Sequence, residues 1–359
     1  MMKGDRYYSK VEEQGYYIIA EAGVNYYEFA ERFSVSPLEG AKMMVKAAAE
    51  NGADAIKFQT YKAKFLAMKD SPGAWDRNDI PVETQYELFQ MYDRLGEAEY
   101  KELSEYSESL GIEFISTPFD LESADYLEPY MEEYKISSSD ISNIPLMTKI
   151  AQKNLPIILS TGASTVDEID EAVSLIRKYN NRRLTLLHCV LEYPTPYENA
   201  NLLKIRALKE RYPDVIVGYS DHTKPDANMD VLKTAYLLGA KVIEKHFTLD
   251  KTIKKKNDHF HSMDCDDLKK LKTSLEFIKT IAGSEVLGCQ DDEITTRNSV
   301  RRSAVSARQI NKGEKLTEDM VIFKRPGTGI APKDFITMIG KTAIRDIQED
   351  TLLKQEDFD

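Results

Sequence analysis

The sequence predicts a (β/α)8 barrel, or TIM barrel, followed by a small second domain. Eight short β-branched or apolar runs, each typical of a buried parallel strand, alternate with helical patterns. They extend over about 250 residues, the usual size of such a barrel. Almost every run ends in a polar or charged residue, and in a barrel these ends converge on one mouth. The competing architecture, a doubly wound open sheet, is disfavoured because no GxGxxG motif follows the first run.

The first six strands are predicted in chain order. A strand over residues 17–23 carries Glu21, and a helix over 37–51 follows it, with a glycine behind its last turn. The second strand, 55–60, presents Lys57 and Gln59. A long polar loop with the only tryptophan, Trp75, and then a charged helix lead to the third strand. Strands three to six are predicted at 114–120, 134–140, 156–162 and 184–190.

The last two strands, 215–222 and 241–247, each deliver a histidine where the apolar run ends, His222 and His246. Residues 229–239 lie between them with helical spacing and a glycine stop, so the unit is strand, helix, strand. A right-handed crossover sets the two strand ends side by side. Two neutral imidazoles facing one cleft suit a borderline divalent metal with open coordination positions. The alternative is that each histidine caps its strand through hydrogen bonds.

Other polar residues fall at the same predicted mouth. Lys57 and Lys135 lie inside apolar runs, which is unfavourable for an ammonium group unless it faces a cavity and meets an anion. The alternative is a pair of structural lysines in salt bridges. Ser138, Ser160 and Ser220 add hydroxyl donors of the kind that hold phosphate or carboxylate. Together these residues predict a site for a small, multiply charged anion beside a metal.

All five histidines lie between residues 188 and 261. The segment 258–261 follows the last strand and could close over the mouth, although an exposed polar loop is the preferred interpretation for His261. The lysine run 254–256 is interpreted as a solvated face, close enough to attract an anionic substrate.

Composition restricts the classes of function. The chain has 359 residues, a net charge of −12 and a sequence pI near 5.1. An acidic protein of this kind is repelled by nucleic-acid backbones and anionic membrane surfaces, so neither is an expected partner. Its three cysteines lack CxxC spacing, and no run approaches the ~18 apolar residues of a membrane span. We therefore expect a cytoplasmic protein.

The barrel pattern stops after a helix predicted at 265–282. We expect a barrel domain over 1–285, a polar linker over 286–298 and a second domain over 299–359. In the second domain the run that begins at Ile310 is loosely echoed by the run that begins at Ile347. So small a domain has a thin core, and we expect it to dock on a barrel in its own chain or in a partner.

Nine segments, in the same order as in the sialic acid synthase family, resemble that family and cover nearly the whole chain. They are IIAEAGVN, GADAIKFQT, ISTPFD, YKISSSDISNIPL, PIILSTGAST, LLHC with YPTPYE, GYSDHT, GAKVIEKHFTLDKT and KRPGTGI. The resemblance implies a transferase that condenses phosphoenolpyruvate with an N-acetylhexosamine such as N-acetylmannosamine. The products would be an N-acetylneuraminate-type nonulosonic acid and phosphate. It also implies that the second domain is an antifreeze-like (SAF, β-clip type) domain.

The resemblance assigns roles to individual residues. His222 and His246 match the metal ligands, with Mn²⁺ as the expected ion and Mg²⁺ or Co²⁺ as alternatives. Glu21 matches an acidic residue beside the reacting carbons. Asp140 and Asp258 match positions near the sugar, and we count Asp258 with the catalytic residues. The phosphoenolpyruvate positions are matched by Lys57, Thr117, Lys135, Ser138, Ser160, Tyr193 and Ser220, and we add Gln59 as a further substrate-binding candidate.

The family also predicts how the chains assemble. Arg325 matches the arginine that the tail domain of one protomer contributes to the sugar site of the other. The resemblance therefore implies a domain-swapped homodimer.

Three departures from the family pattern surround the sugar. Tyr26-Tyr27-Glu28 and an insertion to about Pro37 replace a His-x-Gly segment, Leu191 replaces a polar residue, and residues 254–257 replace a Pro-Gly-Pro turn. Two alternatives to an N-acetylneuraminate synthase stay open. One is a sister synthase for legionaminic or pseudaminic acid that uses a 2,4-diacetamido hexose. The other is a catalytically silent carbohydrate-binding protein, which the intact histidine and lysine set argues against.

Overall fold

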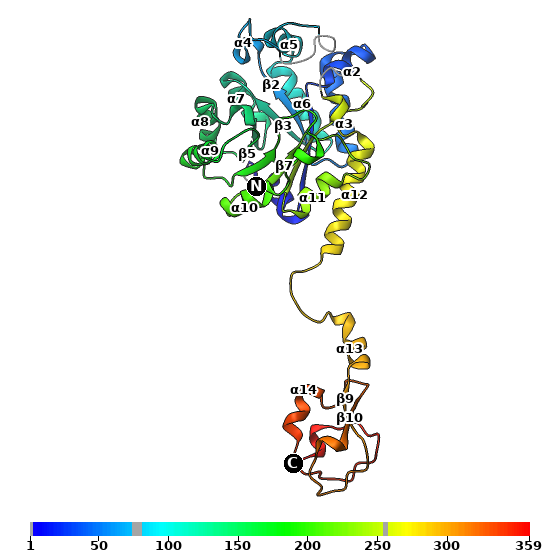
Figure 1. Ribbon diagram of the computed structural model, residues 1–359. Coiled ribbons are helices and arrows are strands. Elements are labelled where there is room, and N and C mark those ends of the chain that lie inside the picture. Colours follow the sequence, from blue (N-terminus) through cyan, green and yellow to red (C-terminus); the bar gives the residue numbers. More distant parts are fainter. Residues whose placement is uncertain (1–2, 74–80, 254–257) are drawn as a thin grey trace. The chain divides into compact units, whose positions relative to one another are not determined.

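The structure is a computed structural model that describes residues 3–73, 81–253 and 258–359. The chain divides into two compact units, Met1–Ala282 and Gly283–Asp359 (Figure 1). Trp75 and the lysine run 254–256 lie outside the described residues. Among the helices of the described ranges, none combines the length and the apolar character that crossing a membrane requires.

The first unit is a nearly closed barrel of eight parallel strands, as predicted. The sheet order is β3-β2-β1-β8-β7-β6-β5-β4, and β3 and β4 lie next to each other where the barrel closes. Each hydrogen-bonded pair of neighbours is parallel. The strands are β1 (Tyr17–Gly23), β2 (Ala55–Thr60), β3 (Glu113–Pro118), β4 (Tyr134–Ile136), β5 (Ile157–Ser160), β6 (Thr185–Cys189), β7 (Ile216–Asp221) and β8 (Val242–His246).

Helices surround the strands (Figure 1). They begin with local signals that the sequence carries: Ser36 accepts a hydrogen bond from the Glu39 amide at the start of α3, and Thr165 and Glu168 form a capping box at the start of α9. The helices of this unit are α1 (Asp5–Ser9), α2 (Tyr26–Phe33), α3 (Pro37–Glu50), α4 (Ala63–Leu66), α5 (Gln85–Met91), α6 (Glu97–Ser109), α7 (Leu121–Tyr126), α8 (Ile144–Gln152), α9 (Val166–Tyr179), α10 (Lys204–Arg211), α11 (Asp230–Leu237) and α12 (Cys265–Ala282).

Side-chain alternation along the strands separates the two faces of the barrel wall. Outward-facing side chains pack against the helices in the main core. Inward-facing apolar side chains, among them Ile19, Ile115 and Val242, fill the barrel itself. Tyr7 of α1 is fully buried in this inner cluster, and its hydroxyl lies 2.6 Å from Thr185 Oγ1. Apolar side chains therefore fill the barrel from the N-terminal ends of its strands up to the polar residues at their C-terminal ends.

Two local differences from the predicted elements affect the mouth. Strand β4 ends at Ile136, earlier than expected, because Ser137 caps a 3-10 helix, Ser138–Asp140, through its side chain. The insertion after β1 folds into helix α2, whose Tyr26 and Tyr27 rings stack with centroids 4.4 Å apart. Both tyrosines and Phe29 are buried, so the insertion adds to the core.

The second unit has its own small core. Its two-stranded antiparallel sheet pairs β9 (Ser303–Ser306) with β10 (Val321–Lys324), and its helices are α13 (Ile294–Val300) and α14 (Pro332–Phe335). The two echoing runs meet, since Ile310 and Ile347 exchange two backbone hydrogen bonds of 2.8 Å. Residues 286–298 are exposed and include the start of α13. Their role as a linker stays a prediction.

Candidate active site

A cavity of about 200 Å³ opens at the C-terminal ends of the barrel strands, and each of the eight strands contributes to it. The structure brings most of the predicted site residues together here. Those that line the cavity are Glu21, Lys57, Gln59, Thr117, Lys135, Ser138, Ser160, Tyr193, Ser220, His222, His246 and Asp258. In a barrel this end of the sheet is where catalytic residues gather, because the turns that follow the strands can vary without disturbing the core.

Two buried lysines and two buried carboxylates form a charge network across the cavity. The strand register sets Glu21 beside Lys57 and Ser220 beside Glu244. Lys57 forms an ion pair with Glu21 and lies 3.9 Å from Glu244, while Lys135 lies 3.5 Å from Glu244. Ser220 donates a 2.8 Å hydrogen bond to Glu244. The ammonium groups are thus held in place by carboxylates before any ligand arrives.

Burial and neighbouring charge set the protonation of this network. Burial opposes the charged form of Lys57, but the charges of Glu21 and Glu244 outweigh it and raise the Lys57 pKa. Burial lowers the pKa of Lys135 despite the attraction of Glu244. Burial would raise the pKa of Glu244, yet Lys135 and Lys57 outweigh it and hold the pKa below its usual value. Burial raises the pKa of Glu21 although Lys57 opposes the shift, which suits a group that exchanges a proton.

The two predicted histidines lie side by side. Their ring centroids are 5.4 Å apart, and the Tyr193 ring covers His222 at 4.2 Å. His222 Nδ1 lies 2.6 Å from the Val190 carbonyl oxygen. Because a carbonyl only accepts, Nδ1 carries the proton and Nε2 has a free lone pair. Burial lowers the pKa of His222. Burial, and after it the nearby His261 and His222 rings, lowers the pKa of His246 well below its usual value, so both imidazoles are neutral at pH 7.

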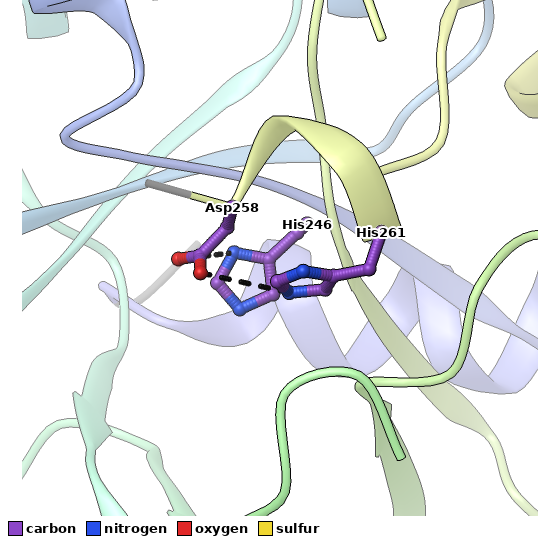
Figure 2. A group of neighbouring side chains, drawn as sticks. All are labelled: His246, Asp258 and His261. Carbon is purple, nitrogen blue, oxygen red and sulfur yellow. Dashed lines mark ion pairs between the residues drawn. The ribbon is translucent and has the colours of Figure 1, made fainter. Parts of the chain in front are cut away.

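A third histidine, His261, adjoins His246, with their ring centroids 5.0 Å apart (Figure 2). His261 was expected on an exposed loop, but that expectation is wrong, because its side chain is fully buried. The turn that carries it, a 3-10 helix over His259–His261, is held inward by its first residue: Phe29 of α2 packs on the His259 ring at 5.2 Å. His259 Nδ1 also lies 2.8 Å from Thr248 Oγ1.

Asp258 connects the histidines. Its Oδ2 lies 3.3 Å from His246 Nδ1, and its Oδ1 lies 3.7 Å from His261 Nε2 (Figure 2). Burial, with the charges of Glu21 and Glu28, raises the pKa of Asp258 to about 7. His246 Nδ1 and both His261 nitrogens have no hydrogen-bond partner within the described part of the chain. Buried imidazole nitrogens with unused lone pairs fit a divalent metal ion.

Some cavity residues were missed in the sequence. Glu244 lies two residues before His246 in β8, so strand alternation alone puts both on the inner face, and this signal was available. Phe119, Ser137 and Cys189 also line the cavity, and Cys189 is a buried free thiol.

Two predicted site residues do not line the cavity. Asp140 is half-buried in the 3-10 helix after β4 and accepts a 2.9 Å hydrogen bond from Asn143. Arg325 is an exposed residue of the second unit.

Comparisons with known proteins identify the family. The model of the NeuB family matches residues 44–286, and the model of the SAF domain matches residues 301–359. The N,N'-diacetyllegionaminic acid synthase of Legionella pneumophila is 39% identical over 347 residues, covering 95% of this chain and 94% of that protein. The N-acetylneuraminate-9-phosphate synthase of Drosophila melanogaster is 31% identical, with 93% of both chains covered.

Solved structures agree. The N-acetylneuraminic acid synthetase of Leptospira borgpetersenii, solved with citrate, superposes with a TM-score of 0.66 at 34% identity. The match covers 79% of this chain and 92% of that one. The resemblance seen in the sequence is confirmed: the chain belongs to the NeuB family of sialic acid synthases, and its second unit is a SAF domain.

Proposed function

We propose that this protein is a nonulosonic acid synthase. It joins phosphoenolpyruvate to the open-chain form of an N-acetylhexosamine and releases phosphate. The observation that carries the proposal is one cavity in which two buried ammonium groups, Lys57 and Lys135, face two neutral imidazoles, His222 and His246. Relatives that are similar over nearly their whole length are synthases of legionaminic, neuraminic and pseudaminic acids.

The lysine side of the cavity would bind phosphoenolpyruvate. Ammonium groups offset the charge of its phosphate and carboxylate groups, and burial strengthens each interaction because little water competes. Lys57 and Lys135 already have carboxylate partners, so an incoming anion must share or displace them. Hydroxyl groups around the lysines would supply further hydrogen bonds, from Thr117, Ser138, Ser160 and Ser220, and Gln59 and Tyr193 complete the wall.

The histidine side would hold a divalent ion, with Mn²⁺ as the first expectation and Mg²⁺ or Co²⁺ as alternatives. His222 Nε2 and one nitrogen of His246 would be its protein ligands. Such an ion would polarise the aldehyde oxygen of the acceptor and offset the negative charge that develops there.

The remaining steps are assigned to the chain's own residues. Carbon 3 of phosphoenolpyruvate forms a bond with the aldehyde carbon, and carbon 2 becomes electron-poor and takes up water. Glu21, whose pKa is raised by burial, would accept a proton from that water. The tetrahedral carbon then expels phosphate, whose charge Lys57 and Lys135 stabilise as it leaves. Asp258 faces the histidines and would orient a sugar hydroxyl, while Asp140 stays a candidate for the outer end of the sugar.

Two acceptors are proposed for the sugar site. The first is an N-acetylmannosamine-like hexosamine. The second is a 2,4-diacetamido hexose, and it is favoured by the identities of 39% and 38% to two N,N'-diacetyllegionaminic acid synthases. The insertion after β1, which departs from the family pattern, forms helix α2 with its buried tyrosines at the end of the barrel that holds the cavity.

Assembly and compartment are also part of the proposal. We infer a domain-swapped homodimer in which Arg325 of one protomer completes the sugar site of the other. Arg325 is exposed, and among the residues that the structure describes it has no ion pair or side-chain hydrogen bond. Three free cysteines support a reducing compartment such as the cytoplasm.

The test is phosphate release from phosphoenolpyruvate with Mn²⁺ and a panel of acceptors. The panel contains N-acetylmannosamine, its 6-phosphate, and 2,4-diacetamido-2,4,6-trideoxy sugars. We expect phosphate release with one acceptor class only, together with formation of a nonulosonic acid of matching mass. Chelation of the metal should abolish both the phosphate release and the product. Tight acceptor binding with no release under any condition would instead support a carbohydrate-binding protein and reject the synthase.

A further inference from the structure

The nitrogens that face Asp258 form a second candidate position for a metal ion, separate from the His222 side. One ligand atom from each of His246, Asp258 and His261 lies within 4.8 Å of the other two. His246 Nδ1 lies 3.3 Å from Asp258 Oδ2, and His261 Nε2 lies 3.7 Å from the other carboxylate oxygen, Oδ1. Ligands at 2.0–2.1 Å around a tetrahedral ion are separated by roughly 3.4 Å. Small side-chain rotations therefore suffice to close the three groups around one ion.

The two positions compete for His246. Its Nδ1 points at the Asp258 carboxylate (Figure 2). An ion shared with His222 would use Nε2 and require the proton on Nδ1, as in a carboxylate–histidine–metal arrangement. An ion shared with Asp258 and His261 would use Nδ1 and require the proton on Nε2. Because a neutral imidazole carries one proton, His246 can serve only one of the two ions at a time.

The ligand chemistry favours zinc at the second position. Two imidazoles and one carboxylate with a fourth position left open is a common set for Zn²⁺. Nitrogen ligands also bind Zn²⁺ more tightly than Mn²⁺, which stands at the weak end of the divalent series. Burial of His261, with neither ring nitrogen hydrogen-bonded in the described part of the chain, leaves a lone pair with no other use.

We propose that His246, Asp258 and His261 form a Zn²⁺ site whose occupation withdraws His246 from the ion of the His222 side. Zinc would therefore inhibit the enzyme in competition with Mn²⁺. The competition rests on the function proposed above, whereas the zinc site itself does not. His261 is the residue that distinguishes the two positions, because it does not line the cavity.

The test is a titration of the chelator-treated full-length protein with Zn²⁺ alone against a zinc-sensitive dye. We compare the wild type with His261→Phe, which keeps a ring in the buried space, and with His222→Ala. A third variant, His188→Gln, is the control, since His188 is buried in β6 and bonds to the Ala200 carbonyl at 2.8 Å. We expect one equivalent of zinc in the wild type, His222→Ala and His188→Gln. Loss of one of three protein ligands in His261→Phe should weaken binding roughly 100-fold or more, beyond the effect of an outer-shell partner.

Equal zinc affinity in the wild type and His261→Phe would overturn the proposal. So would loss of zinc from His222→Ala with retention in His261→Phe, which would put zinc on the cavity side. If His261→Phe does not fold, anomalous scattering at the zinc edge from wild-type crystals decides, because a peak bonded to His261 supports the site and its absence there rejects it. In the activity assay, zinc inhibition relieved by excess Mn²⁺ is expected. A protein that binds zinc as described but condenses nothing would reject the proposed function alone.

Discussion

Asp221 and Lys245 form an ion pair across β7 and β8 in which the Nζ–Oδ2 distance is 2.5 Å and each side chain is only 1% exposed. The two residues are direct partners in the strand register. Each immediately precedes one cavity histidine, and because side chains alternate along a strand, the pair lies on the outer face while His222 and His246 face inward. The pair on the outer face of the barrel wall therefore fixes the relative position of the two imidazoles on the inner face.

Replacing Lys245 with methionine should destabilise the barrel strongly. The change leaves Asp221 as a buried carboxylate without its cation, at a cost of about 3–5 kcal/mol. Adding Asp221→Asn removes the uncompensated charge and should recover part of the loss. The measurement is urea unfolding followed by far-UV circular dichroism.

The control for this prediction is Lys46→Met, which removes an exposed lysine paired with Glu50 at 3.8 Å on α3. It should change the unfolding free energy by about 0.5 kcal/mol or less. An unfolding free energy of Lys245→Met equal to that of the control would show that the buried pair does not stabilise the barrel.

Replacing Lys135 with methionine should weaken phosphoenolpyruvate binding while the protein stays folded. The stem volume is kept, and Glu244 retains Ser220 and Lys57 as partners. Loss of one buried ammonium–anion contact should cost roughly 2 kcal/mol, or about 30-fold in Kd. Isothermal titration calorimetry with phosphoenolpyruvate measures it, and Lys46→Met again serves as the unaffected control. Unchanged affinity in a folded Lys135→Met protein would assign Lys135 a structural role.

The barrel and most of its mouth were predictable because strand periodicity is local information. Apolar runs with polar ends predicted all eight strands. Because side chains alternate along a strand, counting residues along each run puts Lys57, Ser220 and His246 on the inner face of the barrel. The same count puts Glu244 on the inner face, although Glu244 was not among the predicted site residues.

His261 was not predictable in this way. Its burial depends on helix α2 packing over the turn that carries it, a contact between segments more than 200 residues apart in the chain. The insertion after β1 gave no strand signal, and its helix forms because Tyr26, Tyr27 and Phe29 find a partner surface that only the folded barrel provides. Likewise, the early end of β4 depends on a side-chain cap at Ser137.

A buried carboxyl group at the end of the barrel opposite the cavity, Glu133, should make the stability of the protein depend on pH. Glu133 is fully buried there; its Oε1 accepts a 2.9 Å hydrogen bond from the Tyr17 hydroxyl, and its Oε2 has no partner within the described residues. Burial, with a contribution from Glu113, raises the pKa of Glu133 well above its usual value. A carboxyl group with a raised pKa binds its proton more tightly in the folded state. Its contribution to stability is present below about pH 4.5 and is lost as pH rises toward the folded pKa.

Glu133→Gln removes this dependence, because the amide keeps an acceptor for Tyr17 and cannot ionise. The advantage of the variant over the wild type in unfolding free energy should grow with pH above about 4.5, by at most about 1.4 kcal/mol for each pH unit. Urea unfolding at pH 5, 6, 7 and 8 measures the difference. Glu108→Gln, an exposed glutamate at the end of α6, is the control and should show a constant difference. A pH-independent difference for Glu133→Gln would mean that Glu133 titrates normally in the folded protein.

Arg325 provides a test of the proposed domain swap. It lies on a turn-rich loop of the second unit, is exposed, and has no ion pair among the described residues. If it completes the partner protomer's sugar site, each working site combines a barrel from one chain with a tail from the other. Arg325→Ala and His246→Ala proteins should each be inactive. When they are mixed under conditions that allow subunit exchange, heterodimers should regain one working site, built from the barrel of the Arg325→Ala chain and the tail of the His246→Ala chain.

Random exchange at equal concentrations makes half of the dimers mixed, and each mixed dimer has one of its two sites restored. Activity should therefore approach about a quarter of the wild-type value, because the other sites carry at least one defect. Arg302→Ala, which removes another exposed arginine of the second unit, is the control and should be active without mixing. A cis arrangement predicts no recovery at any mixing ratio, because the tail and barrel of each site then share the same defective chain. Sedimentation of the wild type as a monomer at assay concentrations would also exclude the swap, since a protomer without a partner has no second tail to complete its cavity.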